Sequence, residues 1–158
     1  MYAILDIETT GGKYNEEGIT EIAIYKFDGH EIVDQFSSLV NPEKNIQPFV
    51  VNLTGINNKM LYNAPKFYEV AKRIIEITED CILVAHNAQF DNRILTTEFA
   101  RLGYSFEKEI VCFFKEVETN YKFILNTFSF LLFPSRGPPS WSSGAPWGAP
   151  LTPIFVKK

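Results

Sequence analysis

The stretch that decides the fold is Met1-Tyr2-Ala3-Ile4-Leu5-Asp6-Ile7-Glu8-Thr9-Thr10-Gly11-Gly12. Its residues 2–7 form a short, nearly unbroken apolar run, which is typical of a strand covered on both faces of a sheet. The run stops at a loop of threonine and glycine, residues 9–12. We therefore expect a central strand followed directly by a turn.

Two acidic residues stand at the end of this predicted strand. Asp6 and Glu8 are two positions apart, so both side chains point to one face with their α-carbons roughly 6.6 Å apart. Hard cations such as Mg²⁺ and Mn²⁺ prefer carboxylate oxygens, and two of them roughly 3.5–4 Å apart activate a water and stabilise the leaving oxygen of a phosphodiester. Acids at strand ends are more often loop or capping residues, but the central strand and the turn, with its backbone donors, favour a metal site here.

Two further strands follow. Residues 19–27 and 31–40 are rich in β-branched and aromatic residues, and Asp28-Gly29 between them is a signal for a two-residue hairpin. We expect the two strands to pair antiparallel. Asn41-Pro42 ends the second strand, because proline donates no hydrogen bond to a ladder.

Helical periodicity appears in the second half of residues 1–112. After Asn63-Ala64-Pro65, which provides a cap and an early proline, apolar residues at three- and four-residue steps predict an amphipathic helix: Phe67, Val70, Ala71, Ile74 and Ile75. Residues 81–85 form another apolar run, which predicts a buried strand. A second helix, ending near Gly103, is marked by Phe90, Ile94, Leu95, Phe99 and Leu102. The predicted order is strand, strand, strand, helix, strand, helix.

A second polar cluster, His86-Asn87-Ala88-Gln89-Phe90-Asp91, spans the last predicted strand-to-helix junction. Asn87 suits the helix cap, and Asp91 falls in or just after the first turn, where the helix dipole favours its ionised form. The alternative is that Asp91 is an ordinary acid at a helix start and His86 a hydrogen-bonded core histidine.

Composition limits the class of protein. A chain of 158 residues, 46% of them hydrophobic, indicates one soluble domain, and its net charge of −4 provides no overall basic field for a polyanion. Contacts with nucleic acid must then come from local donors or bound cations. Cys81 and Cys112 lack metal-ligand spacing, which favours reduced thiols, and neither a signal peptide nor a membrane span is apparent. We expect a cytoplasmic protein that does not associate with membranes.

The character of the chain changes beyond about Cys112. Six of the nine prolines lie in this tail, and we expect residues 135–150 to be loop-like or disordered. We therefore divide the chain into a domain, residues 1–112, and a tail, residues 113–158.

Three motifs in this order resemble the proofreading exonucleases: Asp6-Ile7-Glu8-Thr9-Thr10-Gly11, Leu53-Thr54-Gly55-Ile56 and His86-Asn87-Ala88-Gln89-Phe90-Asp91. These are the DEDDh-type 3′–5′ exonucleases, which include the epsilon subunit of bacterial DNA polymerase III. The resemblance runs over about residues 1–112, which implies that these form a partial domain and residues 113–158 a divergent tail. It implies an α/β, ribonuclease H-like fold, with a mixed sheet of antiparallel strands plus a parallel strand, flanked by helices and incomplete at its C-terminal part.

The resemblance also implies roles for individual residues. Two Mg²⁺ or Mn²⁺ ions would be bound by Asp6, Glu8 and Asp91, with Asp6 bridging both. The terminal nucleotide would be contacted by Thr9, Thr10 and Gly11, and its sugar and base by Leu53, Thr54 and Phe90. Stacking on Phe90 would tolerate any base. The junction would be braced by His86 and Asn87. The alternative for Leu53 and Phe90 is plain core packing.

One part of the family's site is missing. The family completes it with a histidine, the general base, followed five residues later by an aspartate, the fourth metal ligand. Here the histidines are His30 and His86, and no aspartate follows Asp91. We expect impaired activity, since loss of a general base costs about 10²–10⁴-fold in rate.

The expected function is hydrolysis of single nucleotides from the 3′ end of single-stranded DNA by a two-metal mechanism. One alternative is a non-catalytic module that binds nucleic acid or a polymerase. Another is an RNA-directed exonuclease of the same superfamily, because the three motifs do not distinguish deoxyribose from ribose. A DNA polymerase subunit is the expected protein partner.

Overall fold

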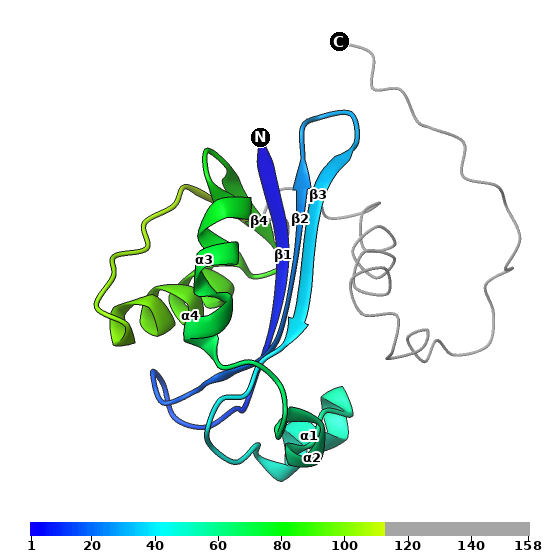
Figure 1. The fold of residues 1–158 in the computed structure, drawn as a ribbon, viewed down its shortest axis with the longest axis vertical. Helices are drawn as coiled ribbons and strands as arrows, with labels where there is room; N and C mark the ends of the chain where they lie inside the picture. Colours follow the sequence, from blue (N-terminus) through cyan, green and yellow to red (C-terminus); the bar gives the residue numbers. More distant parts are fainter. Residues whose placement is uncertain (113–158) are drawn as a thin grey trace, which may run out of the picture.

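The computed structural model describes residues 1–112, so the predicted tail, residues 113–158, lies outside the described residues. Figure 1 shows the elements in chain order: β1 (Tyr2–Thr9), β2 (Ile19–Phe27), β3 (Ile32–Leu39), α1 (Pro48–Thr54), α2 (Asn58–Leu61), α3 (Phe67–Thr78), β4 (Ile82–Ala85), α4 (Ala88–Arg101) and β5 (Ile110–Cys112). Each strand and helix that the sequence predicts within residues 1–112 is present.

The strands form one mixed sheet in the order β3-β2-β1-β4-β5. β1 pairs antiparallel with β2, and β2 pairs antiparallel with β3. β1 pairs parallel with β4, and β4 with β5. The predicted α/β architecture is therefore confirmed, and β1 is the central strand.

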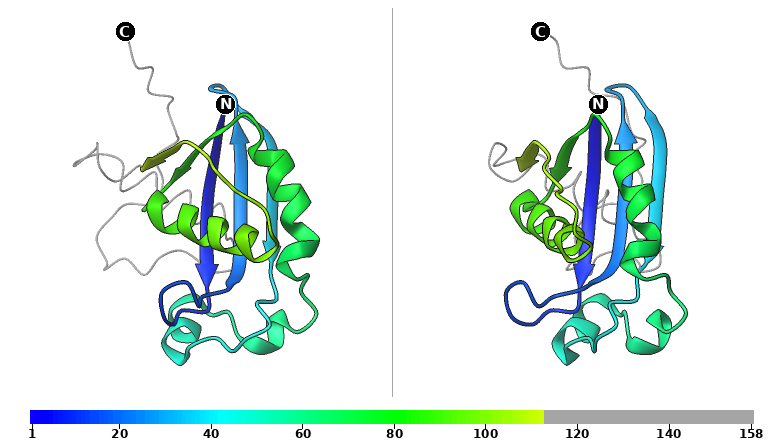
Figure 2. Two further views of the ribbon diagram at one scale, coloured as in Figure 1. Left: turned by 90° about the vertical axis from the view of Figure 1, so that its left-hand side faces the viewer. Right: turned by 60° about the vertical axis from the view of Figure 1, so that its left-hand side comes forward.

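Helices α3 and α4 cover the same face of the sheet (Figure 2). Burial in β1 alternates, and the residues that enter the main core are Ala3, Leu5 and Ile7. The residues between them, including Asp6 and Glu8, are only half-buried. The apolar run predicts a strand covered on both faces, and the structure shows that the face with Asp6 and Glu8 is less covered than the core face. The sequence does not reveal this difference, because Ile4 is apolar although it lies on the half-buried face with the two acids.

Two local details differ from the sequence-based predictions. The β2–β3 connection is a four-residue turn rather than a two-residue hairpin, because the Asp28 carboxylate accepts hydrogen bonds from the amides of His30 and Glu31 at 2.7 and 2.9 Å. The cap of α3 is not formed by residues 63–65. Instead, the Lys66 amide donates to the Glu69 carboxylate at 2.7 Å.

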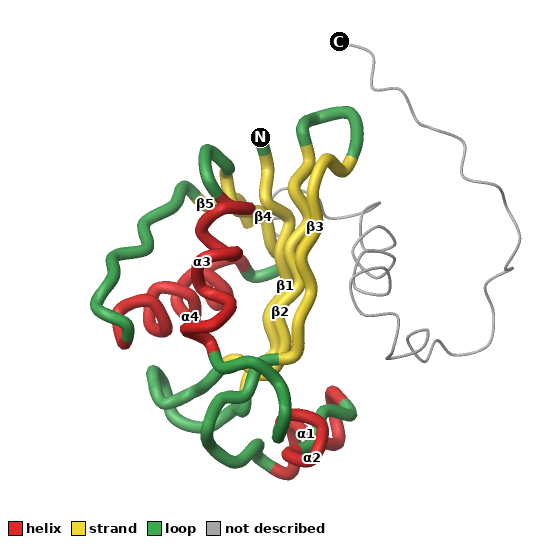
Figure 3. Tube along the Cα trace, in the orientation of Figure 1, coloured by secondary structure: helices red, strands yellow, loops and turns green. Residues whose placement is uncertain are grey.

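The short helices α1 and α2 were not predicted from the sequence. They lie beyond the end of the sheet at which β1 ends (Figure 3). Their small core is separate from the main one and contains Ile46, Val50, Ile56 and Leu61. With 7 and 4 residues, these helices are too short to show a reliable apolar period.

No helix within residues 1–112 is both long and apolar enough to cross a membrane. The cytoplasmic location stays a prediction. Both cysteines carry free thiols, Cys81 buried and Cys112 half-buried, as expected.

Candidate active site

The end of β1 meets the start of α4 because β4 is short. β4 pairs with β1 only along Tyr2–Ile4, whereas β1 continues to Thr9. The chain turns after β4 and enters α4 at Ala88. The β1 edge beyond Ile4 is thus not paired with β4, and the first turn of α4 approaches the strand where its acids lie.

The three predicted carboxylates share one electrostatic neighbourhood. Asp91 lies in the first turn of α4, as expected, and is only 6% exposed. Burial raises the pKa of Asp91 to about 8, and the negative charge of Asp6, with a smaller effect of Glu8, raises it too. A hydrogen bond with the Ile7 backbone acts in the opposite direction. Two carboxylates from β1 therefore act on a buried third one from α4.

The raised pKa of Asp91 corrects one expectation. A carboxyl at a helix start was expected to be held in its ionised form by the helix dipole. Burial and the like charge of Asp6 outweigh the dipole here, so without a cation much of Asp91 keeps its proton at neutral pH.

The donor set fits a hard divalent cation in its chemistry, because it consists of carboxylates whose mutual repulsion a cation relieves. However, within residues 1–112 no three His, Cys, Asp or Glu side chains are arranged closely enough to hold a metal ion. The assignment of Asp6, Glu8 and Asp91 as metal ligands thus stays a prediction.

The turn after β1 is tightly hydrogen-bonded. The Thr10 amide donates to the Gly18 carbonyl at 2.9 Å, and the Gly18 amide donates back to the Thr10 hydroxyl at 3.2 Å. The Gly11 amide donates to the Thr9 hydroxyl at 3.3 Å. The Thr9 and Thr10 side chains are buried and engaged within the turn. Both hydroxyls are therefore already hydrogen-bonded within the turn.

The turn also packs against α1. The Gln47 amide donates to the Thr10 carbonyl at 2.9 Å. Gly11 has φ +66°, and a methyl group there would lie 2.8 Å from Cγ2 of Val50. Only glycine fits this close approach without displacing α1. The turn that ends the first motif thus packs against α1, the helix whose last residue is Thr54 of the second motif.

The predicted pocket residues lie in different environments. Leu53 is 80% exposed, which excludes the core-packing alternative for this residue. Thr54 is buried, and its hydroxyl donates to the Val50 carbonyl at 2.9 Å. Phe90 is half-buried and packs against the main core, so packing contributes to its role.

The structure rules out two of the local interpretations for the junction residues. His86 is exposed, so it is not a core histidine. Asn87 occupies the cap position of α4, but its side chain makes no capping hydrogen bond. Its backbone has φ +80°, and its carbonyl accepts from the Phe90 amide at 2.7 Å. The bracing at this residue comes from its backbone rather than its side chain.

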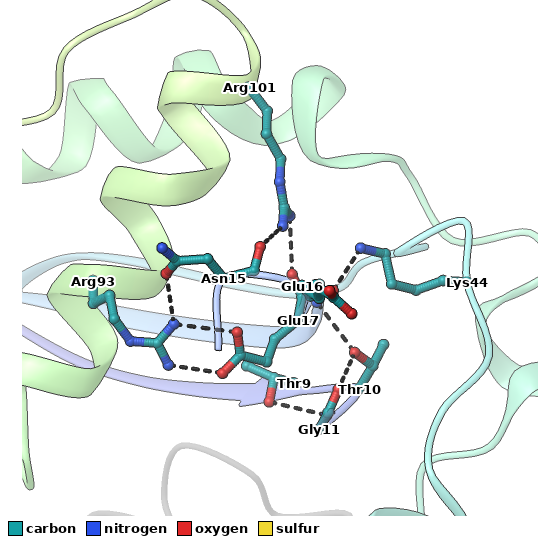
Figure 4. A network of polar contacts seen from close by, with 10 residues as sticks. Thr9, Thr10, Gly11, Asn15, Glu16, Glu17, Lys44, Arg93 and Arg101 are labelled. Carbon is teal, nitrogen blue, oxygen red and sulfur yellow. Dashed lines mark hydrogen bonds and ion pairs between the residues drawn. The ribbon is translucent and has the colours of Figure 1, made fainter. Parts of the chain in front are cut away.

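The structure adds residues that the sequence analysis did not single out. Arg93 and Arg101 of α4 hold the loop between β1 and β2 through Asn15 and Glu17 (Figure 4). Each arginine is 76 to 86 positions from its hydrogen-bond partners in the chain, so no local sequence pattern predicts these contacts.

Comparisons with known proteins agree with the fold and motifs. The family model described as Exonuclease (RNase_T) matches residues 3–142. The DNA polymerase III PolC-type protein of Caldanaerobacter subterraneus subsp. tengcongensis is 36% identical over 110 residues, or 70% of this chain and 8% of that protein. The protein of the same name from Staphylococcus aureus is 39% identical over 103 residues, or 65% of this chain and 7% of that protein. The chain thus spans less than a tenth of the length of these relatives.

Solved structures include similar folds. Exonuclease X in complex with 5′ overhanging duplex DNA has a TM-score of 0.59 and 26% identity, over 82% of this chain and 74% of that chain. The nuclease domain of 3′hExo, a DEDDh family member, bound to rAMP, has a TM-score of 0.55 and 22% identity, over 66% of this chain and 60% of that chain. The second likeness concerns the fold alone. Together with the mixed sheet, these matches confirm the ribonuclease H-like architecture.

Proposed function

Because the chain belongs to the exonuclease family that the RNase_T model describes, we propose that it hydrolyses single nucleotides from the 3′ end of DNA. The observation that carries this proposal is the buried Asp91 carboxyl, whose pKa is raised by burial and by Asp6 and Glu8 at the end of β1. Such a cluster of repelling carboxylates is stable in its ionised form only around cations.

Each residue then has a defined task. Asp6, Glu8 and Asp91 would hold Mg²⁺ or Mn²⁺, and Asp6 would serve both ions. When bound, the ions supply an activated water and stabilisation of the leaving oxygen. The backbone of Thr9, Thr10 and Gly11 orients the terminal phosphate and sugar. The sugar and base of the terminal nucleotide contact Leu53 and Thr54 of α1 and Phe90 of α4.

The similarity to proteins named DNA polymerase III PolC-type supports DNA as the substrate and a polymerase subunit as the partner. A proofreading role follows from this, since an exonuclease beside a polymerase receives the 3′ end of the growing strand. The last nucleotides of this DNA must be unpaired for its 3′ end to reach the carboxylates near the end of β1.

We expect slow hydrolysis. No aspartate follows Asp91 and no histidine follows His86, so this sequence lacks the general base and the fourth acid that the family motif contains. Loss of a general base costs about 10²–10⁴-fold in rate. The same absence supports a second candidate, a module that binds a 3′ end without cleaving it.

Cleavage of end-labelled oligonucleotides separates these functions. With Mn²⁺, a 5′-labelled single strand should shorten one nucleotide at a time, whereas a 3′-labelled strand should release labelled mononucleotide at once. Matched DNA and RNA strands decide the sugar preference. Calorimetric binding of a nucleoside 5′-monophosphate without any cleavage would favour the binding module.

Titration of Mn²⁺ by electron paramagnetic resonance tests the metal ligands independently of activity. At least one ion should bind, and Asp6→Asn should weaken binding most, because Asp6 would serve both ions and the amide carries no charge. Glu76→Gln on the exposed side of α3 is the matched control. Equal affinities in wild type and Asp6→Asn would refute the proposed site.

A further inference from the structure

A charged network joins α4 to the loop that follows the Thr9–Gly11 turn (Figure 4). The Arg93 guanidinium donates to both oxygens of the Glu17 carboxylate, at 2.8 and 3.2 Å, and to the side-chain oxygen of Asn15 at 3.2 Å. The side chains of Arg93 and Glu17 are only 19% and 9% exposed. The hydrogen bonds from Arg93 hold the pKa of Glu17 below its usual value. A two-pronged, largely buried pair of this kind fixes orientation as well as distance.

The pair acts on the Thr9–Gly11 turn through one residue. Glu17 precedes Gly18, whose amide and carbonyl both bond to Thr10, at 3.2 and 2.9 Å. A displacement of Glu17 therefore displaces Gly18 and, with it, Thr10. The Arg93–Glu17 pair thus sets the position of the turn relative to α4.

The same guanidinium contacts two aromatic rings. It lies 4.4 Å from the centroid of Tyr14 and 5.3 Å from the centroid of Phe90, both within the range of cation–π attraction. Phe90 is one of the proposed pocket residues. Arg93 therefore contacts Phe90 on one side of the proposed pocket and, through Glu17, orients the Thr9–Gly11 turn on the other side.

We propose that Arg93 is a positioning residue, which fixes the Thr9–Gly11 turn and the Phe90 ring in register with Asp91. Asp91 lies two positions before Arg93 on α4, so one short helical segment carries both the buried acid and the arginine. This inference rests on the proposed function and extends it by naming what holds the two halves of the site together.

A second arginine shows that Arg93 is not needed merely to attach the loop. Arg101 already donates to the backbone carbonyls of Asn15 and Glu17, at 2.6 and 2.9 Å. Without Arg93 the loop keeps these two bonds near the far end of α4. What is lost is the pair of hydrogen bonds to the Glu17 carboxylate and the contact between Arg93 and Phe90, and therefore the orientation of the turn.

The test compares Arg93→Met with Arg73→Met. Arg73 is the matched control, because it is an arginine of α3 that pairs with Asp34 of β3 and so likewise ties a helix to another part of the fold. Arg93→Lys keeps the charge but not the fork of two donors. Two quantities are measured for each variant: the affinity for a nucleoside 5′-monophosphate with Mn²⁺ by calorimetry, and hydrogen exchange at the Thr10 and Gly18 amides.

Arg93→Met should weaken nucleotide binding by about tenfold, as losing a residue that orients a metal site usually does. Arg93→Lys should fall between it and wild type. Exchange at Thr10 and Gly18 should become faster in both variants, whereas Arg73→Met should match wild type in both measurements. Should Arg93→Met not fold, judged by circular dichroism, Arg93→Lys carries the comparison.

Wild-type affinity and exchange in Arg93→Met, or an equal loss in Arg73→Met, would overturn the inference. If the wild-type protein binds no nucleotide, the proposed function fails and the exchange data decide the positioning role by themselves. Faster exchange at Thr10 in Arg93→Met then supports that role, and unchanged exchange overturns it.

Discussion

Helices α3 and α4 cover the same face of one sheet, yet they contribute different things. The buried side chains of α3 are apolar apart from Thr78, whose hydroxyl donates to the carbonyl of Ile74. α4 buries Asp91 in its first turn alongside its apolar residues. α3 is tied to the sheet by Arg73 and Asp34, which are both about one-third exposed, whereas the Arg93–Glu17 pair of α4 is largely buried.

This difference indicates that the buried residues of α3 stabilise the fold, whereas part of α4 lowers the stability of the folded protein. A buried carboxyl with a raised pKa opposes folding at neutral pH. Asn87, with φ +80°, adds a left-handed backbone conformation without a side-chain cap. Such features persist where function requires them. Four predictions test whether the two helices divide their tasks in this way.

The largest effect is expected from Asp91, the acid in the first turn of α4. Asp91→Asn should lower Mn²⁺-dependent cleavage by about 100-fold or more, since changing a residue that only supports a ligand already costs about 10–100-fold. The counterpart on α3 is Glu69, whose carboxylate accepts from the Lys66 amide. Glu69→Gln should leave cleavage unchanged. Rates on a labelled single strand measure both, and a similar loss in the two variants would show that α4 is not special.

The core of α3 should be the most sensitive to truncation. Ile74 is fully buried and its neighbour Ile75 is 44% exposed, so the two form a matched pair. Ile74→Ala should lower the free energy of unfolding by about 2–5 kcal/mol and Ile75→Ala by less than about 1 kcal/mol. Urea denaturation gives both values. Nucleotide affinity, measured where each variant is folded, should not change.

The pH dependence of stability should come from α4. Asp91 has an ordinary pKa of 3.8 and a pKa of about 8 in the folded protein. Between these values the unfolded chain releases a proton that the folded one keeps, so stability falls as pH rises. Without metal, wild type should lose on the order of 1–3 kcal/mol more than Asp91→Asn between pH 5 and pH 8. Parallel pH profiles in urea denaturation would contradict the buried acid.

The smallest effect is expected from the ion pair of α3. Arg73→Met should change the free energy of unfolding by at most about 1 kcal/mol, because exposed pairs contribute little. Arg93→Met leaves Glu17 buried without its guanidinium partner and should cost more. Equal costs in thermal or urea unfolding would remove the distinction between the two pairs.

Most of the fold followed from the sequence. Apolar runs and β-branched residues located β1, β2, β3 and β4, and three- to four-residue apolar periods located α3 and α4, since burial of one helix face imposes such a period. The short helices α1 and α2 were not predicted, because one or two helical turns are too short to show an apolar period. The four-residue turn at Asp28 and the cap of α3 at Lys66 were not predicted, because individual hydrogen bonds of the Asp28 and Glu69 side chains determine them rather than an apolar pattern.

The candidate site divides in the same way. The sequence by itself determined the spacing of Asp6 and Glu8 on one side of a strand and the place of Asp91 in the first turn of a helix, because these are properties of a single element. Only the tertiary structure decided that β4 stops short, that the Asp91 carboxyl is buried beside like charges, and that Arg93 bonds to Glu17. Burial, charge repulsion and the Arg93–Glu17 contact depend on distances through space between residues far apart in the chain, which no local pattern encodes.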